Sequence, residues 1–152
     1  MELIIQNIDK KYKYTFVAVF IAGIMAHGYM FFNKISFHDD VHCLFSLGST
    51  VELGRWLLEI IRRILNGIVG KYSMPLWTGM VSLLFIALSA SMVIGLLEIK
   101  ETLHCVLIGM IMVVFPAVTG TFIFMFTAGC YFFGLFLIVL SVWTMIRYGI
   151  KG

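Results

Sequence analysis

The sequence is poor in charged residues. Asp, Glu, Lys and Arg make up 12% of its 152 residues, whereas a soluble globular domain carries about 25%. Hydrophobic residues make up 61% and the mean hydropathy is +1.02. This composition excludes an ordinary soluble domain and predicts an all-α, polytopic membrane protein whose first partner is the lipid bilayer. The small net charge of +3, in short basic clusters beside apolar segments, does not indicate nucleic-acid binding.

Cysteine is also scarce. Three cysteines without a CxxC spacing exclude a disulfide framework and a structural zinc signature. We therefore expect Cys43, Cys105 and Cys130 to be buried thiols that behave as small apolar residues. The alternative is a disulfide between Cys43 and Cys130, which would require both to face an oxidising compartment.

Two membrane spans follow from uninterrupted apolar runs. Residues 14–32 contain no charged residue and would form a helix of about 28 Å. No small-x-small cleavage site follows the lysines that precede this run, so we expect it to be retained as a first span. Residues 76–97 form the second predicted span, opened by Pro75, a residue favoured in the first turn of a helix.

The last apolar run is too long for one span. The 44 residues from 103 to 146 contain no Asp, Glu, Lys or Arg, and a single helix of that length would measure about 66 Å, twice the hydrocarbon thickness. The run must fold back, which predicts spans near residues 102–118 and 131–146. We expect the apolar turn between them to lie in the membrane interface.

An amphipathic helix is predicted over residues 50–69. Its apolar residues recur every three or four positions, and Ser49 and Glu52 match a capping box. With Trp56 on the apolar face, this helix is expected to lie flat on the membrane in the first outer loop. The alternative, packing on a soluble core, is disfavoured because the chain offers no such core. The polar face consists of Glu52, Arg55, Glu59, Arg62, Arg63 and Asn66.

The distribution of basic residues predicts the orientation in the membrane. With the N-terminus inside, six basic residues would lie on the inside and five on the outside, which is a small difference. However, Lys10, Lys11 and Lys13 precede the first span and only Lys34 follows it closely. Because the first span usually dominates the positive-inside rule, we expect both termini to be cytoplasmic. The sequence therefore predicts a protein that crosses a membrane several times.

The segment "FHDDVHC" contains the main candidates for chemistry. Asp39 and Asp40 come seven and eight residues after the first span, near the outer surface. A carboxylate at membrane depth is costly and is a candidate functional group, whereas at the interface this cost is lower. The alternative is that one of them only caps a short helix. His38 and His42 add nitrogen ligands, but no second His/Cys group completes a zinc site. A divalent cation such as Mg²⁺, held by Asp39 or Asp40 together with a substrate phosphate, remains open.

Three arginines of the amphipathic helix form the second candidate group. Guanidinium groups bind phosphate through two parallel hydrogen bonds, so Arg55, Arg62 and Arg63 are candidates for binding the phosphate of a lipid-linked substrate. The alternative is general attraction to anionic lipid, about 1 kcal/mol per basic residue. Within the first span, His27 is expected to bond to a neighbouring helix.

A first span and, after it, the motifs "FHDD", "LGRWLL", "PLWTGMVSLLFIAL" and "FPAVTGTFIFMFTAGCY" are distributed over roughly residues 14–146. Together they resemble bacterial membrane glucosyltransferases that modify O-antigen and similar surface glycans, and these enzymes are similar to the GT-C class. The resemblance implies a polyprenyl-phosphate-glucose donor and a glycan acceptor. It implies a location in the bacterial inner membrane, and it implies that Asp39 or Asp40 is the catalytic acid/base of an inverting reaction. It further implies that the surface helix guides the donor phosphate. His38 and His42, which flank the two aspartates, are candidate auxiliary groups by their position. The resemblance also implies that this chain corresponds to the N-terminal part of a longer enzyme.

Two hypotheses therefore stand. The first is a glucosyltransferase that uses the lipid-linked sugar donor and needs no other cofactor than, at most, a divalent cation. The second is a small four-span protein without enzymatic activity. Such a protein would flip or bind a polyprenyl-phosphate-linked sugar, or would serve as a subunit beside a flippase or another membrane protein. Sugar transfer by the chain distinguishes the two.

Overall fold

The described part of the protein is helical throughout. The computed structural model describes residues 9–33, 51, 54–67 and 74–149, with the side chains of residues 65–67 excepted, and it contains no strand within them. The predicted all-α class is therefore confirmed. The helices are α2 (Lys10–Phe32), α3 (Trp56–Gly67), α4 (Pro75–Leu96), α5 (Thr102–Val114), α6 (Pro116–Ile123) and α7 (Met125–Tyr148).

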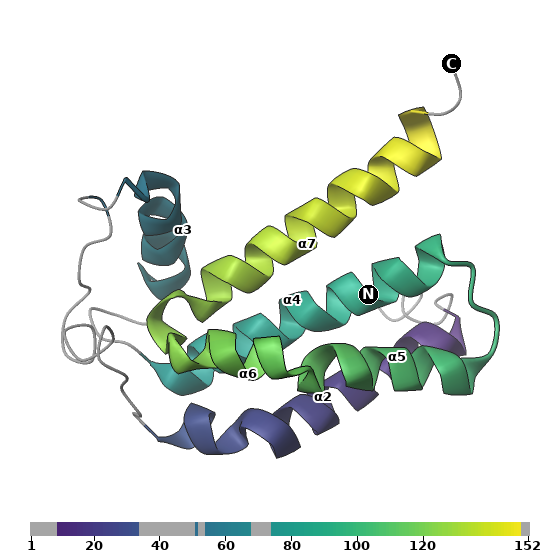
Figure 1. The fold of residues 1–152 in the computed structure, drawn as a ribbon, viewed down its shortest axis with the longest axis horizontal. Coiled ribbons are helices and arrows are strands. Elements are labelled where there is room, and N and C mark those ends of the chain that lie inside the picture. The colour runs from purple at the N-terminus through teal and green to yellow at the C-terminus, as the bar shows by residue number, and fades with distance from the viewer. Residues whose placement is uncertain (1–8, 34–50, 52–53, 68–73, 150–152) are drawn as a thin grey trace.

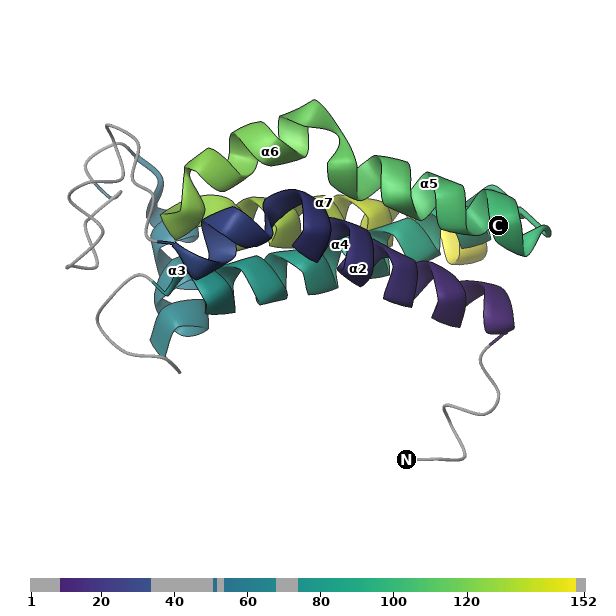
Figure 2. The same cartoon turned by 90° about the horizontal axis from the view of Figure 1, so that it is seen from below.

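Four helical segments are long and apolar enough to cross a membrane: α2, α4, α5 with α6, and α7. They run alternately up and down, so the start of α2, the end of α7 and the α4–α5 turn lie together at one end of the bundle, here called the terminal end (Figures 1 and 2). The end of α2, the start of α4 and the α6–α7 turn lie at the opposite end, beside α3, here called the α3 end. The four-span architecture predicted from the sequence is confirmed.

The third span is bent in the middle. Phe115, between α5 and α6, has φ −59° and ψ 138°, an extended conformation that the following proline imposes on its neighbour. Pro116 itself occupies the first position of α6, where its missing N–H is tolerated. The result is one span, Thr102–Ile123, that bends visibly between its two helices (Figure 2).

The fold-back differs from the sequence prediction. A turn was expected over roughly residues 119–130, but α6 continues to Ile123, and only Phe124 separates it from α7. Gly120 and Gly129, which lie in the expected turn, are helical. In a membrane every backbone N–H and C=O must be bonded within the protein, so a helix is favoured over an irregular apolar loop.

Small residues allow the spans to approach closely. A Cβ atom on Gly109 of α5 would lie 2.6 Å from Thr15 Cγ2 and 2.9 Å from Val19 Cγ2 of α2. Such contacts through glycine are typical of helix packing in membranes, where van der Waals contact contributes much of the association. The core between the spans is formed by Val19, Phe31, Leu83, Ile86, Val113, Phe122, Met125 and Phe132.

The terminal end is held by a long-range hydrogen bond. Lys11 Nζ donates to the carbonyl oxygen of Ile99 at 2.9 Å, which ties the first turn of α2 to the α4–α5 connection. Cys105 is buried near the same turn and Cys130 is buried at the α3 end, both as free thiols. The expectation of buried thiols is confirmed for these two, while Cys43 lies outside the described residues.

Candidate donor-phosphate site at the α3 end

The amphipathic helix begins later than the sequence predicted. It was expected over residues 50–69, but α3 begins at Trp56 and ends at Gly67. Gly54 precedes it with φ +72° and donates its N–H to the carbonyl of Val51 at 2.9 Å. Glycine is favoured in this left-handed conformation. Gly54 therefore forms a chain reversal before α3 and is not part of the helix.

α3 is set across the end of the bundle. In Figure 1 its axis runs across the long axes of α4 and α7, and Figure 2 also places it at the α3 end. It contacts the beginning of α7, where Cys130 Sγ lies 3.8 Å from the carbonyl oxygen of Leu58. A helix in this position covers the end of the spans without crossing the membrane with them.

The two faces of α3 have unusual surroundings. Trp56, Ile60 and Ile64 of the apolar face are 61%, 48% and 66% exposed, whereas Glu59 and Arg62 of the polar face are buried. The polar face is therefore directed in part toward the bundle. This is the reverse of a helix on a soluble core, and it leaves the apolar face available to lipid.

A buried carboxylate joins two of the arginines. Glu59 Oε1 accepts a hydrogen bond from Arg62 Nη2 at 2.7 Å and another from Arg63 Nε at 2.8 Å. The side chains of Glu59 and Arg62 are 4% and 3% exposed, whereas that of Arg63 is 62% exposed. A charge withdrawn from water requires a partner of this kind. The cluster thus fixes Arg62 inside the protein and presents Arg63 at the surface.

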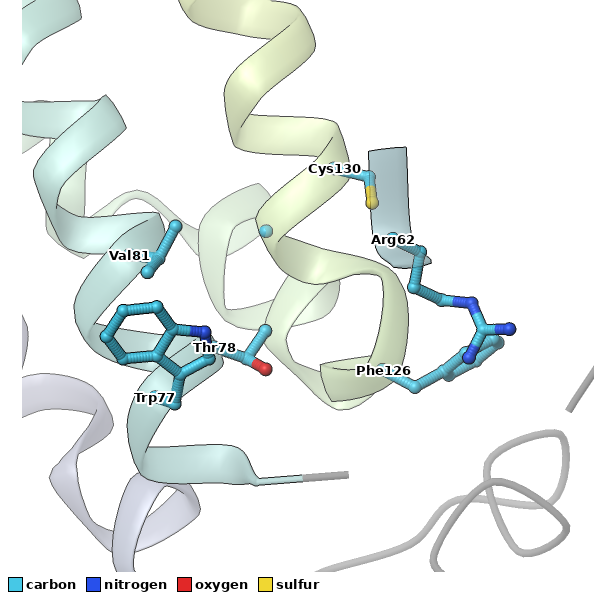
Figure 3. A pocket seen from close by; sticks show the side chains of 7 residues that line it. Arg62, Trp77, Thr78, Val81, Phe126 and Cys130 are labelled. Carbon is cyan, nitrogen blue, oxygen red and sulfur yellow. The ribbon is translucent and has the colours of Figure 1, made fainter. Parts of the chain in front are cut away.

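Arg62 reaches a small cavity between three helices. The cavity of about 10 Å³ has room for a single water molecule, so it is an anchoring contact and not a substrate pocket. Figure 3 shows Arg62 extending from α3 beside the first turn of α7, with Trp77 and Val81 contributed by α4. The lining residues are Arg62, Trp77, Thr78, Val81, Phe126, Gly129 and Cys130.

The sequence model of one protein family, Glucosyl transferase GtrII, matches residues 28–152 of this chain. The chain belongs to the GtrII glucosyltransferase family. The match includes the aspartate loop, α3 and the three spans that follow, so it confirms the resemblance drawn from the sequence motifs. No curated protein and no solved structure matches the chain.

The structure places some of the predicted site residues and leaves others undescribed. Arg55 is exposed directly before α3, Arg63 is largely exposed on it, and Arg62 is buried beneath it. The acidic and histidine candidates of the first loop lie outside the described residues: His38, Asp39, Asp40 and His42. Within the described part of the chain no group of three His, Cys, Asp or Glu residues could hold a metal ion.

Sequence reasoning on this GtrII chain missed the role of Glu59. Its spacing of three and four residues from Arg62 and Arg63 did indicate ion pairs. The local sequence pattern could not show that the carboxylate is buried or that α3 contacts the start of α7. Both features depend on residues about 70 positions apart in the chain.

Proposed function

We propose that this chain takes part in the transfer of glucose from a polyprenyl-phosphate donor to a cell-surface glycan such as O-antigen. The observation that carries the proposal is the GtrII family match over residues 28–152, which includes both candidate groups of the sequence. We place the reaction at the α3 end, on the outer face of the bacterial inner membrane.

The proposed orientation rests on the basic residues of the terminal end. Lys10, Lys11 and Lys13 lie in the first turn of α2, Lys100 lies in the α4–α5 turn, and Arg147 lies in the last turn of α7. All belong to the same end of the bundle (Figure 1). The positive-inside rule assigns such an end, and with it both termini, to the cytoplasm.

We propose that α3 lies in the outer membrane interface. Its exposed apolar side chains would enter the lipid, and its axis crosses the spans as an interfacial helix does. This position would hold the exposed arginines at the depth of lipid phosphate groups.

We propose different roles for the three arginines in binding the donor phosphate. Arg55 and Arg63 are exposed and would hydrogen-bond to the donor phosphate. Arg62 would act indirectly, because its burial against α4 and α7 holds in place the helix that carries Arg63 and that Arg55 directly precedes. Cationic groups at the phosphate stabilise the negative charge that develops as this group leaves.

We propose that Asp39 or Asp40 acts as the general base, with His38 and His42 as auxiliary groups. The acceptor hydroxyl oxygen bonds to the anomeric carbon while the carbon–oxygen bond to the lipid phosphate breaks. The hydroxyl proton passes to the carboxylate, and the phosphate leaves with the bonding electron pair. A divalent cation held by these aspartates would assist the departure of the phosphate.

Donor binding tests the proposal separately from transfer. We suggest reconstituting the chain in vesicles and labelling it with a photoreactive polyprenyl-phosphate-glucose. We expect the combined Arg55→Gln and Arg63→Gln variant to bind at least about 100-fold more weakly, since each lost charge-assisted hydrogen bond is worth about 1.5–3 kcal/mol. The matched control is Arg147→Gln at the terminal end, which should bind as the wild type does. Equal labelling of all three proteins would contradict the proposed phosphate site.

A further inference from the structure

A large groove opens at the terminal end of the bundle, between α2, α4 and α7. Its volume is about 950 Å³, at the upper limit of ordinary ligand sites. It forms where α7 diverges from α4 toward its C-terminus (Figure 1). Most of its wall is apolar or aromatic and includes Phe16, Leu88, Met92, Phe136, Leu140 and Trp143.

The groove has the depth of one membrane leaflet. Its lining on α7 begins at Phe136 and ends at Arg147, a rise of about 16 Å at 1.5 Å per residue. The hydrocarbon core is about 30 Å thick, so the groove runs from the terminal-end surface to about the midplane. A further transmembrane helix would need a groove along the whole thickness.

The charges of the groove lie at its mouth. Lys13 and Arg147 are its two charged lining residues, and both belong to the terminal end. The Arg147 guanidinium carbon lies 5.6 Å from the centre of the Trp143 ring. Within the described part of the chain, the ion pairs join Asp9 to Lys11, Glu59 to Arg62 and Arg63, and Glu101 to His104, and none of them includes Lys13 or Arg147.

We propose that this groove binds an anionic phospholipid of the leaflet at the terminal end. The acyl chains would lie along the apolar wall, and the phosphate would lie between Lys13 and Arg147. A second protein helix would have to cover these two cations with acidic partners of its own, whereas a lipid phosphate supplies the negative charge at the required depth. The inference does not depend on the proposed function, because the groove and α3 are at opposite ends of the bundle.

Tryptophan fluorescence can test this site directly. Trp143 lines the groove, so Trp56→Phe and Trp77→Phe substitutions would make it the single tryptophan reporter. We suggest reconstituting this protein in phosphatidylcholine vesicles that contain a minor fraction of phosphatidylglycerol with brominated chains, which quench nearby indole rings. We expect stronger quenching than the bulk fraction of brominated lipid accounts for, and no such excess when the brominated lipid is phosphatidylcholine.

Charge variants identify the binding groups. Lys13→Gln and Arg147→Gln should each weaken the apparent affinity for brominated phosphatidylglycerol about fivefold. Lys100→Gln, at the same end but outside the groove, is the matched control and should leave the affinity unchanged. Ser91→Phe narrows the groove without altering its charge and should also reduce the excess quenching, because Ser91 lines the wall.

Two results would overturn the proposal. One is equal quenching by the two brominated lipids, which would show a groove filled by bulk lipid without selection for charge. The other is a Trp143 that neither lipid quenches, which would show that protein covers the groove. Cross-linking between chains would then identify a second copy as the occupant.

Discussion

The imidazole Nε2 of His27 lies 2.9 Å from the backbone carbonyl oxygen of Val113, so a side chain of the first span bonds to the backbone of the third. In an unbroken helix the N–H of residue 117 would donate to this carbonyl. The break at Phe115 and Pro116 removes that donor, and the buried His27 ring supplies another. The sequence prediction that His27 bonds to a neighbouring helix is confirmed.

The His27 contact predicts that replacing His27 destabilises the protein. His27→Phe keeps an aromatic ring beside Phe122, whose ring centre lies 4.8 Å away, but it leaves the Val113 carbonyl without its donor. We expect the free energy of unfolding in detergent to fall by about 1–3 kcal/mol, as for a buried polar group without a partner. Thermal or denaturant unfolding followed by circular dichroism measures this change.

The control is to measure the effect of His27→Phe a second time in a protein that carries Pro116→Ala. Alanine would permit a helical conformation at Phe115 and return the backbone donor to Val113. We therefore expect His27→Phe to be much less destabilising in this background. An equal loss of stability in both backgrounds would show that the histidine does not compensate for the proline.

The close approach of α2 and α5 predicts that no side chain larger than that of glycine fits at position 109. Gly109→Ala would place a methyl group against Thr15 and Val19, and overpacking of this kind is destabilising by about 1–3 kcal/mol. Gly120→Ala in the same span is the control, since no atom lies within 4 Å of a Cβ there. It should be neutral or stabilising, because alanine favours helix over glycine by about 1 kcal/mol. If both variants had the same melting temperature, the packing between these helices would be different from that described here.

The buried Glu59–Arg62 pair predicts how α3 is held on the bundle. Glu59→Leu would leave the Arg62 charge buried without its carboxylate, a change of about 3–5 kcal/mol, and should release α3 from α7. Cys130, which is buried beside Leu58, would then become accessible. In a protein with Cys43→Ser and Cys105→Ala, the rate of Cys130 alkylation by N-ethylmaleimide should rise at least about tenfold.

Two further variants check that interpretation. Arg63→Gln removes the exposed partner of the same carboxylate, and exposed ion pairs contribute about 1 kcal/mol or less, so Cys130 should stay protected. The double variant Glu59→Leu with Arg62→Leu replaces the buried pair by apolar groups and should restore protection. Rapid alkylation in the double variant would show that α3 is not held by burial at this contact.

The sequence predicted the architecture well because the bilayer constrains it strongly. Apolar runs of known length give the number of spans, and the need to bond every backbone group gives helices. The same reasoning placed the fold-back incorrectly, since the turn expected between residues 118 and 131 includes Gly120 and Gly129, which are helical. Their conformation is decided by the membrane and by packing, and the chain turns at Phe124 instead.

The candidate site was only partly predictable. Periodicity identified α3 and its arginines, but it could not show that Arg62 faces inward and Arg63 outward, because that depends on the contact of α3 with α7. The periodicity also gave no sign of the turn before α3, which the positive φ of Gly54 shows. The proposed role of Asp39 and Asp40 stays a prediction, since both lie outside the described residues.

The transfer of radiolabelled glucose from polyprenyl-phosphate-glucose to surface glycan in membranes tests the central claim most directly. Membranes containing the wild-type chain should transfer label, and either Asp39→Asn or Asp40→Asn should reduce the rate about 10²- to 10⁴-fold, the contribution of a general base, while donor photolabelling is retained. Transfer that is unchanged in both variants would contradict the assignment of the base. Donor labelling without transfer by the wild-type chain would contradict the enzymatic account and favour a protein that only binds or flips the lipid-linked sugar.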